Sequence, residues 1–359
     1  MSEGTRTLHR REIDDQETWD QTVKHLPYSH VLQSWAWGAF KARHGWRAQR
    51  WVWEADGEPR AAATALTRRI RGLPVRVMYV PKGPALDYDD AALLPHVLSD
   101  LESLAQSQRA LFVKIDPDVR ADTESGEAVV DRLTRRGWRF SPDQVQFRNT
   151  LLLDLSPELD EIMGEMKSKW RYNIRLADRR GVTVRPGGME DLPLLYDMYA
   201  ETSQRGEFVI RPEAYYQDAW GSFIEEGLAR PLIAEFEGEP VAMVLPFRFG
   251  DRAWYMYGAS RTTHREHMPN HRLQWEAIRW AKAQGCQVYD MWGAPDELDK
   301  SDPMWGIYRF KRGFGAKFVP HIGAYDYPAS RLGYRLYVSV MPRILALMRW
   351  RHWRGRSAA

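Results

Sequence analysis

Hydrophobic and polar positions follow the same order twice along this chain. Residues 51–66 and 233–246 each read as an apolar strand, a tight turn written Asp-Gly-Glu-Pro or Glu-Gly-Glu-Pro, and a second apolar strand. The turn glycines, Gly57 and Gly238, permit the positive φ angles of a two-residue hairpin loop. The pattern therefore predicts two equivalent β-hairpins, whose turns lie 181 residues apart.

The match between the two halves continues after the hairpins. Each half next shows a strand that leads to a glycine, a helical segment with apolar residues at i, i+3 and i+4, a further strand, and an Arg-Gly-aromatic step. The paired segments are 75–86 and 252–260, 91–108 and 270–285, 111–119 and 286–295, and 136–138 and 312–314. Each half thus reads as helix, hairpin, strand, helix, strand, strand. This order predicts a mixed α/β (α+β) sheet flanked by helices, and we interpret it as a duplication rather than two unrelated domains.

The join between the halves falls near residue 150. Residues 148–156 form a predicted strand, and a helix should follow with Ser156 as its N-cap and Pro157 at its first position. This helix should run to Gly181, which has the pattern of a C-cap. We expect a first domain at 1–152 and a second at 153–319, with the tail 320–359 packed back on the first.

The composition indicates a globular protein of more than one core. The chain has 359 residues, of which 44% are hydrophobic and 28% charged, and its formal net charge is +3. A single cysteine, Cys286, excludes an internal disulfide framework and a multi-cysteine zinc site, and favours a reducing compartment. The N-terminal residues are charged, and no run of 18 apolar residues occurs, so we expect neither a secretory signal nor a transmembrane helix. These features predict a cytoplasmic protein.

Four stretches carry a specific resemblance. They are LQSWAWGAFKARHGW (32–46), MKSKWRYNIRLADRRGV (166–182), MYGAS with LQWEAIRWAKAQGCQVYDMWGAP (256–260 and 273–295), and GIYRFKRGFGAKF (306–318), supported by VPKGPAL and VKIDPD. Together they resemble the FemABX family along nearly the whole chain. Residues 156–211 leave no room for the coiled-coil arm of some members, so the chain is similar to the compact FemX type. The resemblance implies two tandem GNAT-like acyltransferase domains with a cleft between them.

The resemblance also implies an activity. FemABX enzymes move an amino acid from aminoacyl-tRNA to an amine of the stem peptide of a peptidoglycan precursor, UDP-linked or lipid-linked, and so build the interpeptide bridge. Aminoacyl-tRNA is a co-substrate, and neither a further cofactor nor a metal is implied. Aminolysis of the ester needs positioning and a cation beside the developing oxyanion. Lys311 matches the family's lysine in this role, with Phe310 as its packing or stacking neighbour; the alternative is a solvated lysine in a basic loop.

The precursor's diphosphate would require cations at fixed positions. By the resemblance, Lys41 and Arg211 bind this diphosphate, and an arginine fork suits phosphate oxygens. Tyr215 and Tyr257 match tyrosines near the precursor, and Asp116 would hold the stem peptide or orient its amine. A surface salt bridge for Arg211, core packing for the tyrosines and turn capping for Asp116 remain open.

Two basic segments suggest further partners. The predicted helix at 166–180 interleaves basic residues with Trp170 and Tyr172, which suits a tRNA backbone, although a solvated helix face would look similar. Its candidate tRNA-binding residues are Lys167, Lys169, Arg171 and Arg175. The tail alternates apolar residues with arginine, is broken by Pro342, and ends near Trp350 and Trp353. It reads either as a membrane-surface segment, which would place the protein at the inner face of the cell membrane, or as a segment packed against the first domain.

Other functions stay open. An acyl-CoA-dependent N-acyltransferase would share the fold, but the pyrophosphate loop [RQ]-x-x-G-x-[GA] has no full match, and Arg-Gly-Phe-Gly-Ala-Lys (312–317) fails at its last position. The same tRNA chemistry with a peptide natural product as acceptor is a second alternative. A non-catalytic RNA-binding or membrane-associated protein is a third. Two domains that share a cleft can function as a monomer. The histidines at 264–272 suggest surface loops rather than a metal site.

Overall fold

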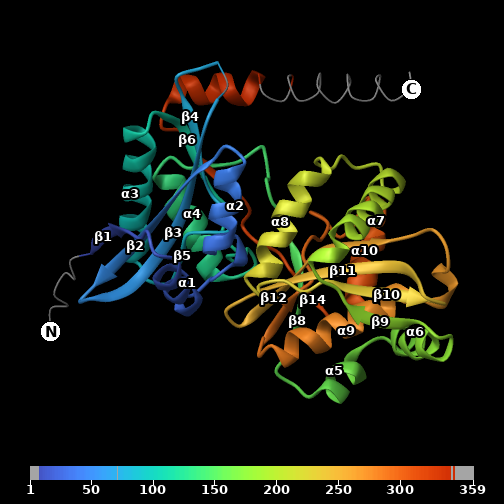
Figure 1. Cartoon of the computed structure of the whole chain (residues 1–359). Helices are drawn as coiled ribbons and strands as arrows, with labels where there is room; N and C mark the ends of the chain where they lie inside the picture. Colours follow the sequence, from blue (N-terminus) through green and yellow to red (C-terminus); the bar gives the residue numbers. More distant parts are fainter. Residues whose placement is uncertain (1–7, 71, 341–342, 344–359) are drawn as a thin grey trace.

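A computed structural model describes residues 8–70, 72–340 and 343 of the chain. Figure 1 shows two domains side by side, each built on one mixed sheet with helices on both faces. The first sheet has the order β1 (His9–Glu12), β2 (Arg47–Ala55), β3 (Glu58–Arg69), β4 (Arg76–Val80), β6 (Ala110–Ile115), β15 (Tyr325–Tyr327) and β7 (Arg139–Phe140), and β5 (Ala85–Leu86) pairs with β3. The second has the order β9 (Thr183–Pro186), β10 (Leu232–Phe236), β11 (Glu239–Phe249), β12 (Arg252–Ser260), β13 (Val288–Asp290), β8 (Thr150–Asp154) and β14 (Lys317–Val319).

The helices fall between these strands. They are α1 (Gln16–His25), α2 (Trp35–Arg43), α3 (Leu93–Ser107), α4 (Glu124–Arg135), α5 (Leu159–Glu165), α6 (Ser168–Arg179), α7 (Leu192–Arg205), α8 (Glu213–Glu225), α9 (Pro269–Ala283) and α10 (Trp305–Arg312), with short 3₁₀ turns η1 (Val31–Gln33), η2 (Met189–Asp191) and η3 (Arg265–His267). Residues 331–340 are also helical. Among the described residues, no helix is both long and apolar enough to cross a lipid bilayer.

The two sheets share one topology. Both hairpins turn on two residues with positive φ, Asp56–Gly57 and Glu237–Gly238, as a type I′ turn requires. Both hairpins also shift register at the equivalent glutamate, Glu54 in β2 and Glu235 in β10. A parallel pair then follows in each sheet, β4 with β6 and β12 with β13. The predicted two-domain α/β fold is confirmed.

Each sheet also contains one strand that, in the sequence, directly follows a strand of the other sheet. β8 follows β7 in the chain but inserts between β13 and β14 of the second sheet. β15 follows β14 but inserts between β6 and β7 of the first sheet. The chain therefore crosses the domain boundary twice, through residues 141–149 and 320–324, and these crossings lie beside the candidate site.

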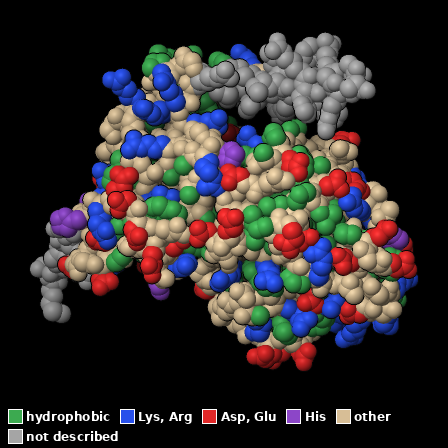
Figure 2. Space-filling view, in the orientation of Figure 1, with side chains coloured by type: hydrophobic (Ala, Val, Ile, Leu, Met, Phe, Trp, Pro, Cys, Tyr) green, Lys and Arg blue, Asp and Glu red, His purple; other side chains and the backbone are tan. Residues whose placement is uncertain are grey.

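Three hydrophobic cores alternate with the two sheets. One packs α3 and α4 on the outer face of the first sheet, and one packs α6 and α9 on the outer face of the second. The third lies between the domains, where Trp19 and Phe40 of the first share a core with Trp220 and Phe247 of the second. Burial of this apolar surface joins the domains into one packed unit and fixes the relative position of residues contributed by each. Figure 2 shows charged side chains of both signs spread over the visible face of both domains.

The single helix predicted from Ser156 to Gly181 is wrong. The structure has two helices, and α5 begins only at Leu159, because the Ser156 hydroxyl donates to Asp154 instead of capping a helix. Met166 is buried in an extended conformation, which ends α5 and places its side chain in the core. The backbone groups at the break between α5 and α6 find hydrogen-bond partners nearby. The Lys167 N–H donates to the Gly313 carbonyl at 2.9 Å, and Arg171 donates to the carbonyls of Gly164 and Met166.

The predicted step from strand directly to strand at the end of each half is also wrong. A helix intervenes in both domains, α4 in the first and α10 in the second. Lys311 therefore lies in the last turn of a helix and is buried, not in a solvated basic loop. The described residues of 156–211 form helices of at most 14 residues, so no long coiled-coil arm is present there. Pro342, Trp350 and Trp353 lie outside the described residues.

Candidate active site

Three predicted residues meet where α2 of the first domain packs against α8 of the second. The Lys41 ammonium donates to the Tyr215 hydroxyl at 2.9 Å and lies 4.7 Å from the centre of the Trp37 ring. The Arg211 guanidinium, from the segment before α8, lies over the Tyr215 ring at 5.2 Å. Lys41, Arg211 and Tyr215 thus form one cluster across the domain boundary.

This cluster carries uncompensated positive charge. Burial, together with the nearby Arg211 and Arg68, lowers the pKa of Lys41 to about 8. None of these three cations has a carboxylate ion-pair partner among the described residues. Lys41 is partly buried and the two arginines are exposed, and cations held close together without counter-charge favour binding of an anion.

Tyr257 lies behind this cluster rather than in it. Its ring packs against Trp220 at 5.4 Å and against Tyr199 at 5.8 Å, within the core shared by the two domains. Burial raises its pKa well above the ordinary value. Tyr257 packs on Tyr216, which in turn packs on Tyr215, so its position fits the core-packing alternative.

Lys311 lies in a second group, built on the second domain. Its ammonium donates to the carbonyl oxygens of Trp292 and Gly293, the latter at 2.7 Å, and lies 5.6 Å from the centre of the Tyr255 ring. Trp292 and Gly293 both have positive φ, which turns the chain after β13 and directs both carbonyls at the lysine. Burial lowers the pKa of Lys311 to about 7, with Asp290 acting in the opposite direction. This side chain therefore titrates near neutral pH.

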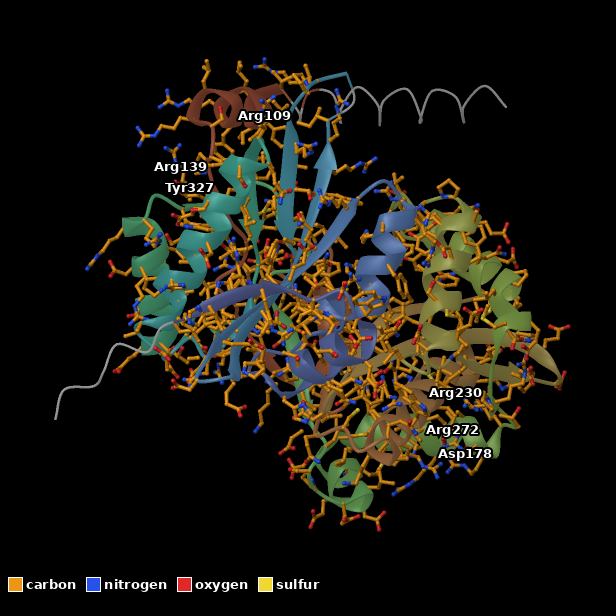
Figure 3. All side chains as sticks on the ribbon, turned by 60° about the vertical axis from the view of Figure 1, so that its left-hand side comes forward. Arg109, Arg139, Asp178, Arg230, Arg272 and Tyr327 are labelled. Atoms are coloured by element: carbon orange, nitrogen blue, oxygen red, sulfur yellow. The ribbon has the colours of Figure 1, made fainter. Side chains whose placement is uncertain are left out.

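Helix α6 holds α10 in place from outside. The Trp170 indole donates to the Phe310 carbonyl at 3.0 Å, and a Cβ added to Gly313 would lie only 2.1 Å from the Trp170 ring. The Phe310 ring packs against Phe314 and His271, so it is a packing neighbour of Lys311 in this structure. On its other side α6 contacts α9 through an Asp178–Arg272 ion pair at 2.7 Å, both labelled in Figure 3. Of the four candidate tRNA-binding residues, Lys167, Lys169 and Arg175 are exposed, whereas Arg171 is engaged by backbone carbonyls.

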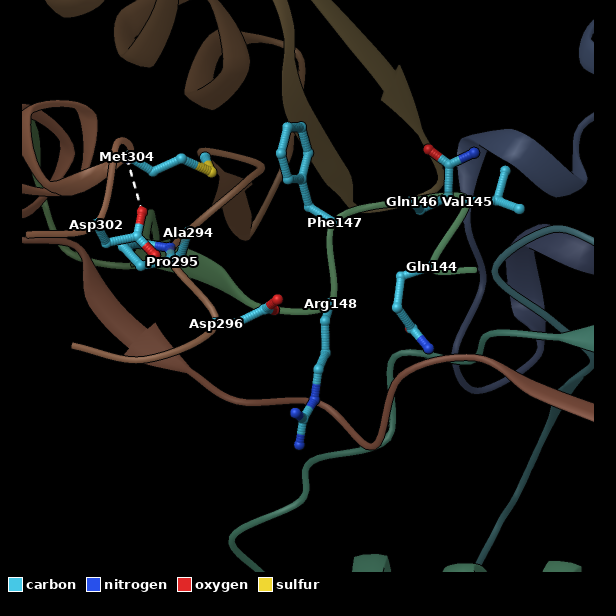
Figure 4. A pocket seen from close by; sticks show the side chains of 10 residues that line it. All are labelled: Gln144, Val145, Gln146, Phe147, Arg148, Ala294, Pro295, Asp296, Asp302 and Met304. Carbon is cyan, nitrogen blue, oxygen red and sulfur yellow. Dashed lines mark hydrogen bonds between the residues drawn. The ribbon is translucent and has the colours of Figure 1, made fainter. Parts of the chain in front are cut away.

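A pocket of about 310 Å³ opens beside the Lys311 group. One side is the first domain crossing, Gln144 to Arg148, and the other is the loop after β13, from Ala294 to Met304 (Figure 4). The Phe147 ring lies on Gly293, where an added Cβ would come within 3.0 Å of it. The carbonyl that accepts from Lys311 is therefore one residue from the pocket wall.

A buried charge network lies next to this pocket, on the first domain. Asp116 accepts from the Tyr79 hydroxyl at 2.7 Å and from the Lys82 backbone N–H at 2.5 Å, and burial raises its pKa to about 6. The Lys82 ammonium pairs with Asp118 at 2.9 Å and donates to the Phe147 carbonyl at 3.2 Å. Its ammonium also lies 5.5 Å from the centre of the Trp292 ring. Asp116 thus adjoins the Lys311 group, through Lys82.

Several members of this network were not among the predicted site residues. Asp118 is the centre, with His321 at 3.5 Å and both His30 and Arg252 at 3.9 Å. Burial acts to raise the pKa of Asp118, but the surrounding cation of Lys82 and the neighbouring groups hold it well below its ordinary value. Burial lowers the pKa of His30 to about 3 and that of His321 to about 4, so both rings are neutral at pH 7. The VPKGPAL and VKIDPD motifs contained Lys82 and Asp118, but His30, Arg252 and His321 are brought there only by the fold.

A separate histidine group lies on the second domain. His264, Glu266 and His267 place their potential ligand atoms within 4.8 Å of one another. Both histidine rings pack on Phe236, and His267 lies 3.3 Å from the Glu266 carboxylate. These contacts give the residues a structural role in the turn before α9.

Comparison with known proteins agrees with this architecture. Residues 15–237 and 225–341 match the FemAB family. The lipid II:glycine glycyltransferase of Staphylococcus haemolyticus (strain JCSC1435) is 26% identical in an alignment covering 94% of this chain and 97% of that protein. The crystal structure of FemX has a TM-score of 0.85 at 23% identity and covers 92% of this chain and 100% of that one. A tandem GNAT protein from the clavulanic acid biosynthesis pathway has a TM-score of 0.54 at 13% identity, covering 90% and 99%, and so shares the fold.

Proposed function

Because this chain belongs to the FemAB family, we propose that it transfers an amino acid from aminoacyl-tRNA to an amine of the stem peptide of a peptidoglycan precursor. The relative from S. haemolyticus is a glycyltransferase that acts on lipid II, which supports acyl transfer to such a precursor. The single observation that carries the proposal is Lys311, a buried cation held by two carbonyl oxygens beside a pocket between the domains.

The reaction needs little covalent help from the protein. The acceptor amine attacks the ester carbonyl carbon, an oxyanion develops, and the bond to the tRNA ribose breaks as the ribose oxygen takes up a proton. An aminoacyl ester is already activated, so the protein's share is to position the reactants and stabilise the oxyanion. The buried ammonium of Lys311 would supply the stabilising charge, since a charge acts more strongly where water is excluded.

The two other groups of residues would hold the substrates. The cluster of Lys41, Arg211 and Tyr215 has the charge and the arginine fork that a diphosphate requires. The exposed Lys167, Lys169 and Arg175 of α6 would meet the tRNA backbone, because α6 packs directly on the helix that carries Lys311. Use of aminoacyl-tRNA would place the reaction in the cytoplasm.

The test is transfer of a labelled amino acid from a mixed aminoacyl-tRNA pool to a UDP-linked and, separately, a lipid-linked pentapeptide precursor. We expect product that disappears after RNase treatment and in Lys311→Met. Product that survives RNase treatment would overturn the tRNA donor. Absence of product with either acceptor, together with tight tRNA binding, would direct the search to another amine acceptor; absence of both would support a non-catalytic role.

A further inference from the structure

The helix at residues 331–340 leaves an apolar stripe unpaired. Its inner face is anchored, because Tyr334 packs on Phe112 of β6 and donates to Asp326 at 3.0 Å. Its outer face exposes Leu332, Leu336 and Val340, which follow one another at four-residue spacing and so lie on one side of the helix. Leu332 is 71% and Leu336 58% exposed, so neither leucine is covered by the described part of the protein.

Arginines surround this stripe. Arg331 and Arg335 are exposed on the same outer face, and Arg109 and Arg139, labelled in Figure 3, flank the helix at the ends of β6 and β7. None of these four has a carboxylate ion-pair partner among the described residues. Two carboxylates lie near this helix: Asp326, which is buried and paired with Lys114, and Asp143, which lies near Tyr337.

The tip between β3 and β4 extends the same end of the domain. Figure 1 shows this tip beside the helix at 331–340. It exposes Leu73 and carries Arg69 and Arg76 next to Arg109. In Figure 2 the visible surface at this end shows basic and hydrophobic side chains, unlike the mixed charges elsewhere. We call this end, with the outer face of the helix, the terminal face.

The sequence that follows has the same character. Residues 331–359 contain seven arginines and no lysine, aspartate or glutamate. Because the whole chain has a formal net charge of +3, residues 1–330 carry a net charge of −4. In the sequence, positive charge is therefore concentrated in the C-terminal segment that includes the exposed leucines, and the rest of the chain has a net negative charge.

We propose that the terminal face binds the surface of an anionic lipid bilayer. Arginines attract anionic headgroups, and adjacent leucines enter the boundary between headgroups and acyl chains. An RNA surface would explain the arginines but not the stripe of Leu332, Leu336 and Val340, because a phosphate backbone offers no apolar partner for it.

This orientation would have a consequence for the site. Residues 139–148 run from the terminal face, at Arg139, to the pocket wall, at Gln144 to Arg148, and Phe140, Val145 and Phe147 along this path are all about half exposed. A protein bound through the terminal face would hold the pocket beside the bilayer, where a lipid-linked acceptor is found. Only this consequence rests on the proposed function; membrane binding itself does not.

The test is sedimentation of the full-length protein with vesicles of phosphatidylcholine alone, or of equal parts phosphatidylcholine and phosphatidylglycerol. We expect binding only to the anionic vesicles, weakened by salt. Replacing the apolar stripe (Leu332→Ser, Leu336→Ser and Val340→Ser together) should weaken binding at least tenfold, and Arg331→Glu with Arg335→Glu should do the same. Val209→Ser, which changes an equally exposed apolar residue on the second domain, should leave binding unchanged.

The outcomes separate this proposal from its alternatives. No sedimentation of the wild-type protein, or full binding by both the stripe and arginine variants, would overturn it. Loss of tRNA binding in the arginine variant, with vesicle binding intact, would make the terminal face an RNA surface instead. Transfer to a soluble UDP-linked acceptor should be unaffected by the stripe variant, so a failure of the proposed catalytic function would be seen separately.

Discussion

The two domains repeat one fold, yet equivalent positions in them have opposite environments. The Arg-Gly-aromatic steps at 136–138 and 312–314 follow α4 and α10, which makes Arg135 the counterpart of Lys311. The Arg135 side chain is 79% exposed and pairs with Asp131 of its own helix, whereas Lys311 is buried and held by backbone carbonyls. The same topological position is a solvated surface in one domain and a candidate catalytic centre in the other.

The two helix ends differ in what packs against them. In the second domain α6 covers α10, with Trp170 packed against Gly313 and bonded to the Phe310 carbonyl. The equivalent Gly137 of the first domain has open space around it. The Lys311 ammonium itself is enclosed by the carbonyls of Trp292 and Gly293 and by the Tyr255 ring, and burial lowers the pKa of this lysine to about 7.

The parallel strand pairs of the two domains also differ in the groups that their tyrosines contact. Tyr79 on β4 and Tyr255 on β12 occupy equivalent strands, but Tyr79 donates to Asp116 while the Tyr255 ring faces the Lys311 ammonium. Acidic and basic groups are closely paired in the first domain, as in Lys82 with Asp118. In the second domain, no carboxylate of the part of the chain that the structure describes forms an ion pair with Lys311. Paired charges stabilise an interface, whereas an unpaired cation remains free to act on a substrate.

The largest effect should come from removing the Lys311 charge. Lys311→Met should reduce transfer about 10²- to 10³-fold, as loss of one oxyanion-stabilising group typically does. The matched Arg135→Met should leave transfer unchanged, because that side chain is solvated. Initial rates at saturating substrates and thermal melting of both variants provide the measurement. Equal rates for the two variants would remove the distinction between the domains.

Reversing the charge of Arg211 tests the cluster between the domains. Arg211→Glu should raise the KM for the acceptor about 10- to 100-fold, since a charge-assisted contact to phosphate becomes a repulsion. The KM for the donor should change by less than a factor of two, which corresponds to a change in binding free energy of less than about RT ln 2. Arg135→Glu is the matched surface control. An unchanged acceptor KM would exclude Arg211 from the diphosphate site.

The sequence could predict those parts of the molecule that local patterns determine. The two hairpins, α3, α9 and the strand at 150–154 follow from turn glycines and apolar spacing. The tail at 320–359 was expected to pack on the first domain, but the insertion of β15 between β6 and β7 could not be predicted, because β15 is three residues long and its partners lie about 185 to 215 residues earlier in the chain. Helix α4 could have been predicted, because Thr123 is a typical N-cap residue and does cap this helix, but the predicted order of strand followed by strand left the helix out.

In the candidate site, too, some features could be predicted from sequence motifs and others depend on the fold. Lys41, Arg211 and Lys311 were named from motifs, and the structure brings Lys41 and Arg211 together. The burial of Lys311 could not be read from Tyr-Arg-Phe-Lys-Arg-Gly, since the groups around its ammonium, the carbonyls of Trp292 and Gly293 and the Tyr255 ring, come from other parts of the chain. The network around Asp118 likewise requires His30, Arg252 and His321, which are far apart in sequence.

The pH dependence of transfer should report the state of Lys311. Its pKa is about 7, so the ammonium is present below pH 7 and is lost as the pH rises through that value. If the cation stabilises the oxyanion, kcat should fall above pH 7, by about tenfold for each further unit. Lys311→Arg, which stays charged, should lack this decline if it retains activity. A rise in kcat through pH 7 that disappears in Lys311→Arg would instead assign a general-base role to the neutral amine.

Gly306 of α10 and Gly313, which caps the end of this helix, test whether α6 makes the difference between the domains. Gly313→Ala would drive a methyl group into the Trp170 ring, so α6 must shift. We expect a loss of about 1–3 kcal/mol in stability, typical of overpacking, and a several-fold lower transfer rate. Gly306→Ala lies in open space on the same helix and should be neutral or slightly stabilising. Thermal melting and transfer rates compare the two; equal behaviour would show that the Trp170 contact does not position Lys311.

The smallest effect should come from the exposed face of α6. Lys169→Ala with Arg175→Ala should raise the KM for aminoacyl-tRNA about threefold to tenfold and reduce its dependence on salt, because two phosphate contacts are lost. Arg171→Ala is the contrasting variant on the same helix, since its guanidinium supports the carbonyls of Gly164 and Met166. That change should lower the melting temperature and leave the salt dependence of the donor KM unaltered. If Arg171→Ala instead reproduced the salt effect of the double variant, α6 would serve mainly to hold α10, and the tRNA would have to bind elsewhere on the second domain.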